Sequence, residues 1–310
     1  MRAAGIVQKG GEVTLLDLPE PRDLRADEVL IDVRPAGVGN WDDIVRSGGW
    51  DVGVVPPMAL GVEAAGTVTA VGSAVRDYQI GEGILTHPLP LRYQGAWAER
   101  LIAPAELVAA LPKTVPWDVA AAFPVPALTA EQVLSEAVGL RDGDSLLVHG
   151  AGGPTGSLVV ALAALRGADV IATAGPASAD RVRRLGARAV FDYRDDTWTD
   201  QAREATGGGV LACVNAARGG AATALRAVRS GGRLATITSD PPEPGRDISV
   251  TNVYVRPDGN QLAMLVELLA TARLFLPVAR TFPLEQAGAA LAHAVSGGLG
   301  GAVVLEVNQA

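Results

Sequence analysis

The stretch that decides the fold is Leu146-Leu147-Val148-His149-Gly150-Ala151-Gly152-Gly153-Pro154-Thr155-Gly156. It reads as a buried strand, a glycine-rich turn and the start of a helix, in that order. Such a turn directs backbone N–H groups and the positive end of a helix toward a pyrophosphate. Although the usual Gly-x-Gly-x-x-Gly spacing is absent, the stretch predicts a dinucleotide site, with Gly150, Gly152, Gly153, Pro154, Thr155 and Gly156 as its cofactor-binding residues.

From about residue 119 onward, apolar strands alternate with helices. The predicted strands are 145–149, 170–173, 189–192, 210–215 and 233–238. The predicted helices between them are 157–166, 179–185 and 221–228. Strands separated by helices of this length indicate βαβ crossovers, and hence an α/β domain with a doubly wound parallel sheet.

Both ends of the chain differ from this middle part. Short strand-like runs at 13–18, 28–34, 66–71 and 84–87 make the first part β-rich. After a polar loop at 239–248 come an apolar stretch 250–255, helices 259–271 and 284–296, and a last strand 302–307. Because that strand needs a sheet to pair with, we predict one domain from residues 1–118 and 253–310 and a second domain from residues 119–252.

The end of the second predicted strand bears on the choice of cofactor. No carboxylate follows residues 170–173 until Asp180, whereas an NAD site usually has an acidic residue there to bind the ribose. This absence permits NADP(H) and makes NAD(H) less favoured. Ser178, Arg181 and Tyr193 are the candidates to hold a 2′-phosphate. The alternative for Arg181 is a solvated helix residue.

Composition excludes several classes of function. The formal net charge is −8, and no basic patch is present, so we expect no nucleic-acid partner. No apolar run is long enough to span a membrane and no signal peptide is evident, so we expect no membrane partner and a cytoplasmic location. The one cysteine, Cys213, shares no metal-ligand spacing with the three histidines, and we expect no zinc.

Several blocks, in their order and spacing, carry a family resemblance. They are LGVEAAGTV at 60–68, GEG at 81–83, GAWAE at 95–99, LTA at 128–130, the turn at 150–156, LGA at 185–187 and GGRL at 231–234. The chain resembles the medium-chain dehydrogenase/reductase superfamily, in its zinc-independent quinone oxidoreductase (zeta-crystallin-like) branch. The resemblance implies a GroES-like β-rich catalytic domain split around a Rossmann-type domain, with NADP(H) as cofactor and homodimers as the usual state.

The resemblance also bears on the metal. Zinc-dependent members carry a Cys soon after an early strand and a His before the motif glutamate. Here the corresponding stretches are 36–40 and Gly61-Val62-Glu63, and neither has a ligand. Without a Lewis acid, alcohol oxidation is disfavoured, whereas hydride addition to an activated C=C or a quinone needs less help. The predicted function is therefore NADPH-dependent reduction of a quinone, an enone or an enoyl compound.

Further residues are assigned to this site. We expect Thr129, Asn215, Ala216 and Thr238 to lie beside the cofactor. Asn40 is the candidate catalytic amide that binds the developing enolate oxygen. Trp41, Trp50 and Tyr254 are candidate substrate contacts, although both tryptophans are equally well explained by packing.

Four other polar residues are interpreted without a catalytic role. We interpret Glu63 as structural, bonded to backbone or Arg, and His149 as packed or hydrogen-bonded. We expect Asp42 and Asp43 to be solvated or to form a turn.

Two alternatives remain from the sequence. One is a non-catalytic regulator that still binds a nucleotide. The other is a biosynthetic tailoring enzyme, a cyclase or enoyl reductase, that keeps the fold with changed chemistry.

Overall fold

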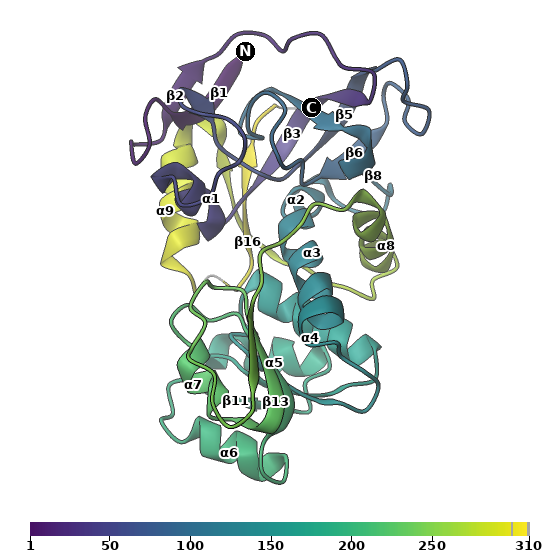
Figure 1. Ribbon diagram of the computed structural model, residues 1–310. Coiled ribbons are helices and arrows are strands. Elements are labelled where there is room, and N and C mark those ends of the chain that lie inside the picture. The colour runs from purple at the N-terminus through teal and green to yellow at the C-terminus, as the bar shows by residue number, and fades with distance from the viewer. Residues whose placement is uncertain (299, 309–310) are drawn as a thin grey trace. The chain divides into compact units, whose positions relative to one another are not determined.

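The computed structural model describes residues 1–298 and 300–308, and the chain divides into two compact units. Unit 2 is the continuous segment Thr129–Val255, and unit 1 combines Met1–Leu128 with the segment from Arg256 onward. The first boundary falls inside helix α3 (Pro124–Gln132), later than the residue 118 expected from the sequence. The second falls after Val255, where the sequence placed it after residue 252. Figure 1 shows the chain with many of its elements labelled.

Unit 2 is built on one parallel sheet. Its strands are β9 (Ser145–His149), β10 (Asp169–Thr173), β11 (Ala189–Phe191), β12 (Val210–Asn215), β13 (Val228–Thr236) and β14 (Ser249–Asn252). Its helices are α4 (Pro154–Leu165), α5 (Pro176–Arg184), α6 (Trp198–Ala205) and α7 (Ala221–Leu225), after the π-helical turn η2 (Val133–Ala137). The six strands lie in the order β11-β10-β9-β12-β13-β14, which confirms the predicted parallel sheet.

This strand order reverses direction between β9 and β12. In doubly wound sheets, ligands bind at the carboxyl ends of the strands on either side of such a switch point. The glycine-rich turn follows β9 and therefore lies at that point. One helix was predicted too long: α7 ends at Leu225, and Val228 already pairs with Val210, because the chain enters β13 there.

Unit 1 contains two mainly antiparallel sheets. The smaller has the order β2-β1-β4, formed by β1 (Arg2–Ile6), β2 (Thr14–Asp17) and β4 (Met58–Ala59). The larger has the order β15-β16-β3-β5-β6-β8, with β7 also paired to β3. Its strands are β3 (Glu28–Val38), β5 (Ala64–Val71), β6 (Gly83–Thr86), β7 (Arg100–Pro104), β8 (Val108–Ala110), β15 (Val278–Pro283) and β16 (Ala302–Glu306).

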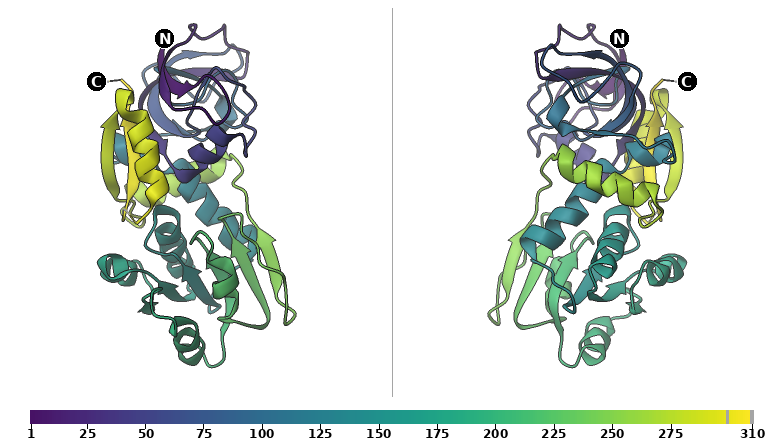
Figure 2. Two further views of the ribbon diagram at one scale, coloured as in Figure 1. Left: turned by 90° about the vertical axis from the view of Figure 1, so that its left-hand side faces the viewer. Right: turned by 90° about the vertical axis from the view of Figure 1, so that its right-hand side faces the viewer.

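The helices of unit 1 come from both ends of the chain. They are α1 (Asn40–Ser47), α2 (Trp117–Ala121), the start of α3, α8 (Gly259–Ala270) and α9 (Ala287–Ser296), with 3-10 turns η1 (Ala105–Leu107) and η3 (Leu284–Gln286). Helix α9 lies beside β15 and β16 (Figure 2). Strand β16 pairs with β3, Val303 opposite Val38, which confirms that the tail rejoins the first part of the chain.

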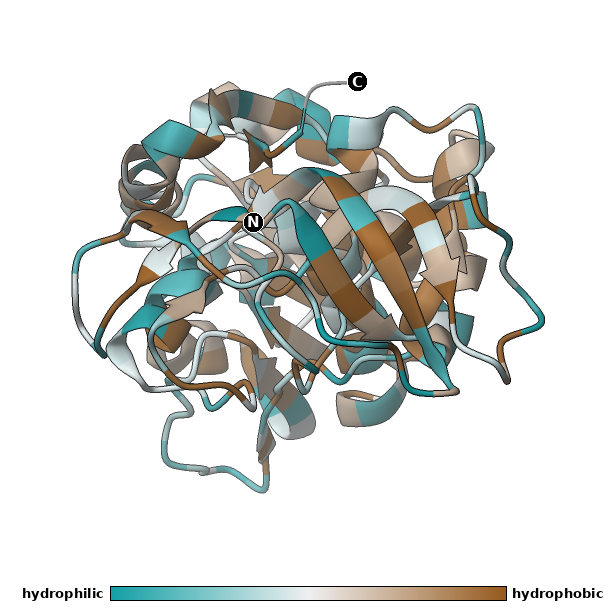
Figure 3. Cartoon of the chain, turned by 90° about the horizontal axis from the view of Figure 1, so that it is seen from above, coloured by the Kyte–Doolittle hydropathy of each residue, from teal (hydrophilic) through white to brown (hydrophobic). Residues whose placement is uncertain are grey.

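Each unit has its own apolar core. In unit 1 the indole of Trp97 is fully buried and donates to the Gly37 carbonyl oxygen at 3.0 Å. In unit 2, residues of α6 and α7 pack with Leu147, Ile171 and Cys213 of the strands. In Figure 3, brown apolar residues and teal polar residues alternate along the strands and helices.

Candidate functional site

The glycine-rich turn of unit 2 is closely packed at two of its glycines. Gly150 has a φ of +87°, and a Cβ there would lie 2.8 Å from the Ala217 backbone nitrogen. A Cβ on Gly156 would collide with the Gly150 carbonyl oxygen. Helix α4 then begins at Pro154, and no side chain caps its first turn. The free N–H groups and the positive end of α4 are thus left for an anion.

Thr173, at the end of β10, anchors this turn. Its carbonyl oxygen accepts from Ala151 N at 3.0 Å and its Oγ1 accepts from Gly150 N at 3.1 Å. Its Oγ1 also lies 2.7 Å from His149 Nδ1. The His149 ring stacks on Trp198 with centroids 4.8 Å apart, and burial lowers the pKa of His149 to about 4. His149 is therefore neutral and held in place, as the sequence interpretation had it.

Ser178 and Arg181 lie against the glycine-rich turn, whereas Tyr193 lies beside Gly175, the residue before α5. Arg181 Nη2 donates to the Gly152 carbonyl oxygen at 2.8 Å and lies 3.4 Å from Ser178 Oγ. Arg181 Nη1 is buried and has no hydrogen-bond partner, and burial lowers the pKa of this guanidinium. Tyr193 lies against Gly175, 3.5 Å from the position of a Cβ there. Arg181 therefore lies on α5 with its side chain bonded to the glycine-rich turn, and it is not a solvated helix residue.

A second guanidinium, that of Arg194, which the sequence interpretation missed, lies beside Tyr193 and Gly175. Arg194 lies 5.7 Å from the centroid of the Tyr193 ring and pairs with Asp192 at 3.0 Å. The sequence does contain a signal for Arg194, because this basic residue directly follows Tyr193, a predicted phosphate contact.

The ends of β12 and β13 hold a network that the sequence interpretation only partly predicted. Asn215 Nδ2 donates to Thr236 Oγ1 at 3.0 Å and to Thr238 Oγ1 at 2.9 Å. Both hydroxyls donate to Asp240 Oδ1 at 2.6 Å. The predicted contacts Asn215 and Thr238 are therefore bonded directly to each other, and both are bonded to Asp240, a residue that no sequence pattern singled out.

The two other predicted cofactor residues also lie in unit 2. The backbone N–H of Ala216 donates to the His149 carbonyl oxygen at 2.8 Å, which joins the end of β12 to the end of β9. Thr129 is buried in α3.

In unit 1, Asn40 is the first residue of α1, a helix that was not predicted from the sequence. The helix begins because Asp42 reaches back: its Oδ2 accepts from Gly39 N at 2.8 Å. The expectation that Asp42 is solvated or in a turn was wrong. Asp42 is 0% exposed, its Oδ1 has no partner, and burial raises its pKa to about 8.

Glu63 is structural, as interpreted. It is buried, and its Oε2 accepts from Val125 N at 2.8 Å at the start of α3. Gly37 leaves room for its carboxyl group, because a Cβ there would collide with Oε1. Burial, and secondarily the nearby Asp42, raises the pKa of Glu63 well above its usual value.

The three candidate substrate residues are divided between the units: Trp41 and Trp50 belong to unit 1, and Tyr254 belongs to unit 2. Trp41 packs over Gly39, and its Nε1 is buried without a partner. The Trp50 ring lies 6.3 Å from that of His87, a buried residue whose Nδ1 lies 2.7 Å from the Val62 carbonyl oxygen. Burial lowers the pKa of His87 to about 4. Tyr254 is 68% exposed and belongs to unit 2.

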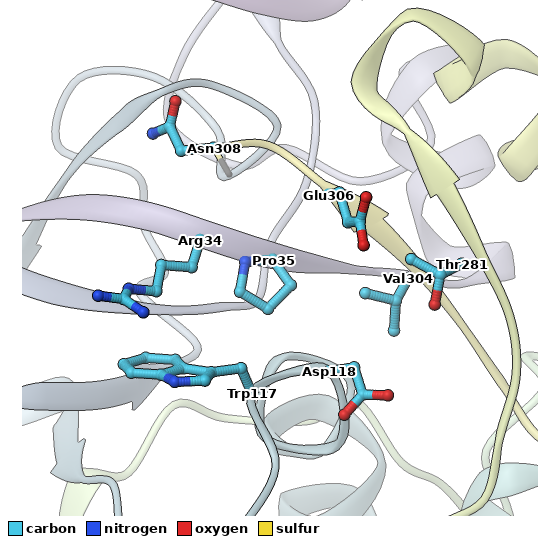
Figure 4. A pocket seen from close by; sticks show the side chains of 8 residues that line it. All are labelled: Arg34, Pro35, Trp117, Asp118, Thr281, Val304, Glu306 and Asn308. Atoms are coloured by element: carbon cyan, nitrogen blue, oxygen red, sulfur yellow. The ribbon is translucent and has the colours of Figure 1, made fainter. Parts of the chain in front are cut away.

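A cavity of about 470 Å³ lies in unit 1 among β3, α2, β15 and β16 (Figure 4). The Arg34 guanidinium lies over the Trp117 ring, 4.6 Å from its centroid, and Arg34 Nε donates to Thr67. Asn308 Nδ2 donates to the carbonyl oxygens of Val33 and Glu99. These polar groups hold the strands together, and no predicted site residue lines the cavity.

Neither a metal site nor a membrane span is found in residues 1–298 and 300–308. No three His, Cys, Asp or Glu side chains there are grouped so that they could hold a metal ion. No helix there has the length and apolarity needed to cross a membrane.

Two family descriptions match the chain: "Alcohol dehydrogenase GroES-like domain" over residues 25–113 and "Zinc-binding dehydrogenase" over residues 185–305. Among curated proteins, Erythronolide synthase EryA2 of Saccharopolyspora erythraea is 39% identical over 207 residues, 66% of this chain and 6% of that protein. The quinone oxidoreductase of Homo sapiens is 29% identical over 213 residues, 67% of this chain and 63% of that protein. The chain thus spans less than two thirds of the length of either relative.

Solved structures match over nearly the whole chain. One described as a NAD-dependent alcohol dehydrogenase has a TM-score of 0.87 and 28% identity, covering 99% of this chain and 100% of that one. The Escherichia coli quinone oxidoreductase complexed with NADPH also has a TM-score of 0.87, with 23% identity and the same coverage, and supports the fold alone. Unit 1 therefore carries the GroES-like fold and unit 2 the Rossmann-like sheet. The chain belongs to the medium-chain dehydrogenase/reductase superfamily and has quinone oxidoreductases among its homologues.

Proposed function

We propose that this chain is an NADP(H)-dependent oxidoreductase, independent of zinc, that transfers hydride to a quinone or to an activated C=C of a small molecule. The observation that carries the proposal is the contact of Arg181 with Gly152 and Ser178, at the strand end where an NAD site has a carboxylate. A guanidinium with a buried, unpartnered Nη1 suits a phosphate and not a bare ribose hydroxyl.

The residues of the chain have distinct parts in this reaction. The turn at Gly150–Gly156 and the first turn of α4 bind the diphosphate, and Arg181 and Ser178 bind the 2′-phosphate. NADPH, when bound, supplies the hydride. The Asn40 side chain donates a hydrogen bond to the oxygen that gains negative charge. Val62 replaces the His of zinc-dependent relatives, so the substrate must already be electron-poor.

A second candidate is reduction of an enoyl group within a biosynthetic pathway. It is favoured by the 39% identity to a stretch of Erythronolide synthase EryA2. The two candidates share the nucleotide site and differ only in the acceptor, so one assay separates them. NADPH oxidation is followed with a panel of quinones, simple enones and enoyl thioesters, and the acceptor with the highest kcat/KM identifies the class.

The nucleotide part of the proposal is tested by fluorescence titration of NADPH and NADH. We expect NADPH to bind more tightly. Arg181→Ala should weaken NADPH about tenfold, since one charge-assisted contact to phosphate is lost, and leave NADH unchanged. Arg184→Ala, an exposed residue of the same helix, is the matched control and should change neither. If neither nucleotide binds the wild-type chain, the proposed function is wrong.

A further inference from the structure

The turn after β13 directs a carboxylate back onto the end of the sheet. Ser239 has a φ of +58°, a left-handed conformation that is uncommon for a residue with a side chain. The next residue, Asp240, is thereby placed over the carboxyl ends of β12 and β13. A non-glycine residue is held in such a conformation only when its surroundings determine it.

Four donors hold Asp240, and all of them are neutral. Thr236 Oγ1 and Thr238 Oγ1 donate to Oδ1 at 2.6 Å, and Asn215 Nδ2 lies 3.2 Å from the same oxygen. The Ala221 N–H donates to Oδ2 at 3.3 Å. Within the part of the chain that the structure describes, Asp240 has no ion pair with Lys, Arg or His. Its charge is therefore fixed in position but not neutralised.

The carboxylate stays ionised at neutral pH. Partial burial by itself raises the pKa of Asp240, but the Thr236 and Thr238 hydroxyls and the Ala221 N–H lower it, and the net pKa is below its ordinary value. The neighbouring His149 is neutral, since burial lowers its pKa to about 4, and it supplies no compensating charge.

The position of Asp240 in the sheet indicates which part of a dinucleotide it would face. A doubly wound sheet binds one mononucleotide over each half, on either side of the switch point. Here Arg181 and Ser178, the proposed contacts of the 2′-phosphate, lie on α5, which follows β10. The strands β9, β10 and β11 therefore take the adenosine half. The strands β12, β13 and β14, over which Asp240 lies, are left for the nicotinamide half.

We propose that Asp240 sets the relative affinity of this site for the two oxidation states of its cofactor. The oxidised nicotinamide ring carries a positive charge and the reduced ring is neutral. A fixed, unneutralised carboxylate over this half of the sheet stabilises the cationic ring and has little effect on the neutral one. The site thus favours departure of hydride from the cofactor. This inference rests on the proposed function.

The same network defines how Asn215 and Thr238 act. The Asn215 amide hydrogens are directed to Thr236, Thr238 and Asp240, and its Oδ1 accepts from Ala217 N at 3.2 Å. Asn215 and Thr238 are therefore positioning residues for Asp240, and their side chains are hydrogen-bonded within this network.

The test is the ratio of the dissociation constants of NADPH and NADP+, measured by equilibrium titration without turnover. In Asp240→Asn we expect NADP+ to bind about fivefold more weakly while NADPH changes less than twofold, as removal of one partly screened charge predicts. Asp196→Asn removes the same charge from an exposed position of unit 2 and should leave the ratio unchanged. Asp240→Glu, which keeps the charge, should keep a ratio closer to wild type than Asp240→Asn does.

Several results would overturn the proposal. A ratio in Asp240→Asn that equals the wild-type ratio, or affinities for both forms that fall together, would give Asp240 a structural role only. A ratio in Asp240→Glu as low as in Asp240→Asn would show that charge is not the cause. These outcomes leave nucleotide binding by the wild type intact, and so leave the proposed function standing. A wild-type chain that binds neither form would remove both.

Discussion

Asp42 in unit 1 and Asp240 in unit 2 both follow the end of a strand, yet their pKa values move in opposite directions. Asp42 is fully buried and accepts one hydrogen bond, from Gly39 N, and burial raises its pKa to about 8. Asp240 is partly exposed and accepts four, and its pKa falls below the ordinary value. The number of donors, together with burial, decides which carboxylate keeps its charge.

The contrast extends to the surroundings of each residue. In unit 1, Trp41 Nε1, Asp42 Oδ1 and His87 Nε2 are all buried without partners. At the strand ends of unit 2, the donors of Asn215 and the hydroxyls of Thr236 and Thr238 are all engaged. The unit 1 groups are uncharged at neutral pH and lack hydrogen-bond partners. The unit 2 carboxylate of Asp240 is charged, and hydrogen bonds hold it.

The largest loss of stability should come from disrupting the close packing of the glycine-rich turn of unit 2. Gly156→Ala places a Cβ against the Gly150 carbonyl oxygen, which lies in the backbone and cannot yield cheaply. We expect a loss of about 2–4 kcal/mol in the free energy of unfolding and a loss of NADPH binding. Denaturant unfolding and fluorescence titration measure the two effects. Gly153→Ala is the control, because its Cβ would lie 3.8 Å from the nearest atom. Equal stability of the two variants would contradict the steric account.

The next largest change should come from removing the buried titratable carboxyl group of unit 1, that of Asp42. The folded chain holds the Asp42 proton up to a pKa of about 8, whereas the unfolded chain releases it near 3.8. The stability contributed by this group is therefore present below pH 4 and is lost as the pH rises to 8. Asp42→Asn should flatten this dependence and stabilise the protein by about 1–3 kcal/mol at pH 7.

The control for this prediction is Asp43→Asn. Asp43 is partly exposed and pairs with Arg46, so its replacement should change stability by less than about 1 kcal/mol. Thermal unfolding between pH 4 and pH 8 is the measurement. A slope with pH in Asp42→Asn as steep as that of the wild type would mean that Asp42 is ionised in the folded chain.

A smaller change should come from removing one hydrogen-bonding hydroxyl group next to the glycine-rich turn of unit 2, that of Thr173. Thr173→Val keeps the shape but removes the oxygen that accepts from Gly150 N and bonds to His149 Nδ1. We expect a loss of about 1–2 kcal/mol in unfolding free energy, because two polar groups lose their partner. Thr14→Val, at an exposed position on β2, is the control and should have little effect. Amide hydrogen exchange at Gly150 should accelerate in Thr173→Val, and an unchanged rate would sink the proposed anchoring role.

Much of the fold of unit 2 could be predicted from the sequence. The strands 145–149 and 210–215 have the predicted bounds, because each is a short apolar run that ends in a turn. Helix α1 was missed for a physical reason. Its N-cap is Gly39, and the signal for its start is a side chain three residues later, Asp42, which reads locally as a turn residue.

The candidate site was predictable where strand order alone brings residues together. Ser178 and Arg181 follow β10, and the glycine turn follows the adjacent β9, so their contact follows from a parallel sheet. The role of Asp240 was not predictable, because it depends on the left-handed conformation of Ser239. Nor was the burial of Asp42, which results from long-range packing.

The pairing of β16 with β3 has a consequence for biosynthesis. Unit 2 is one continuous segment and can fold as the ribosome releases it, whereas the large sheet of unit 1 lacks a strand until β16 emerges. Until then, the edge of β3 from Pro35 to Val38 exposes unpaired backbone groups, a template for association between nascent chains. A chaperone that shields this edge would be needed most during that interval.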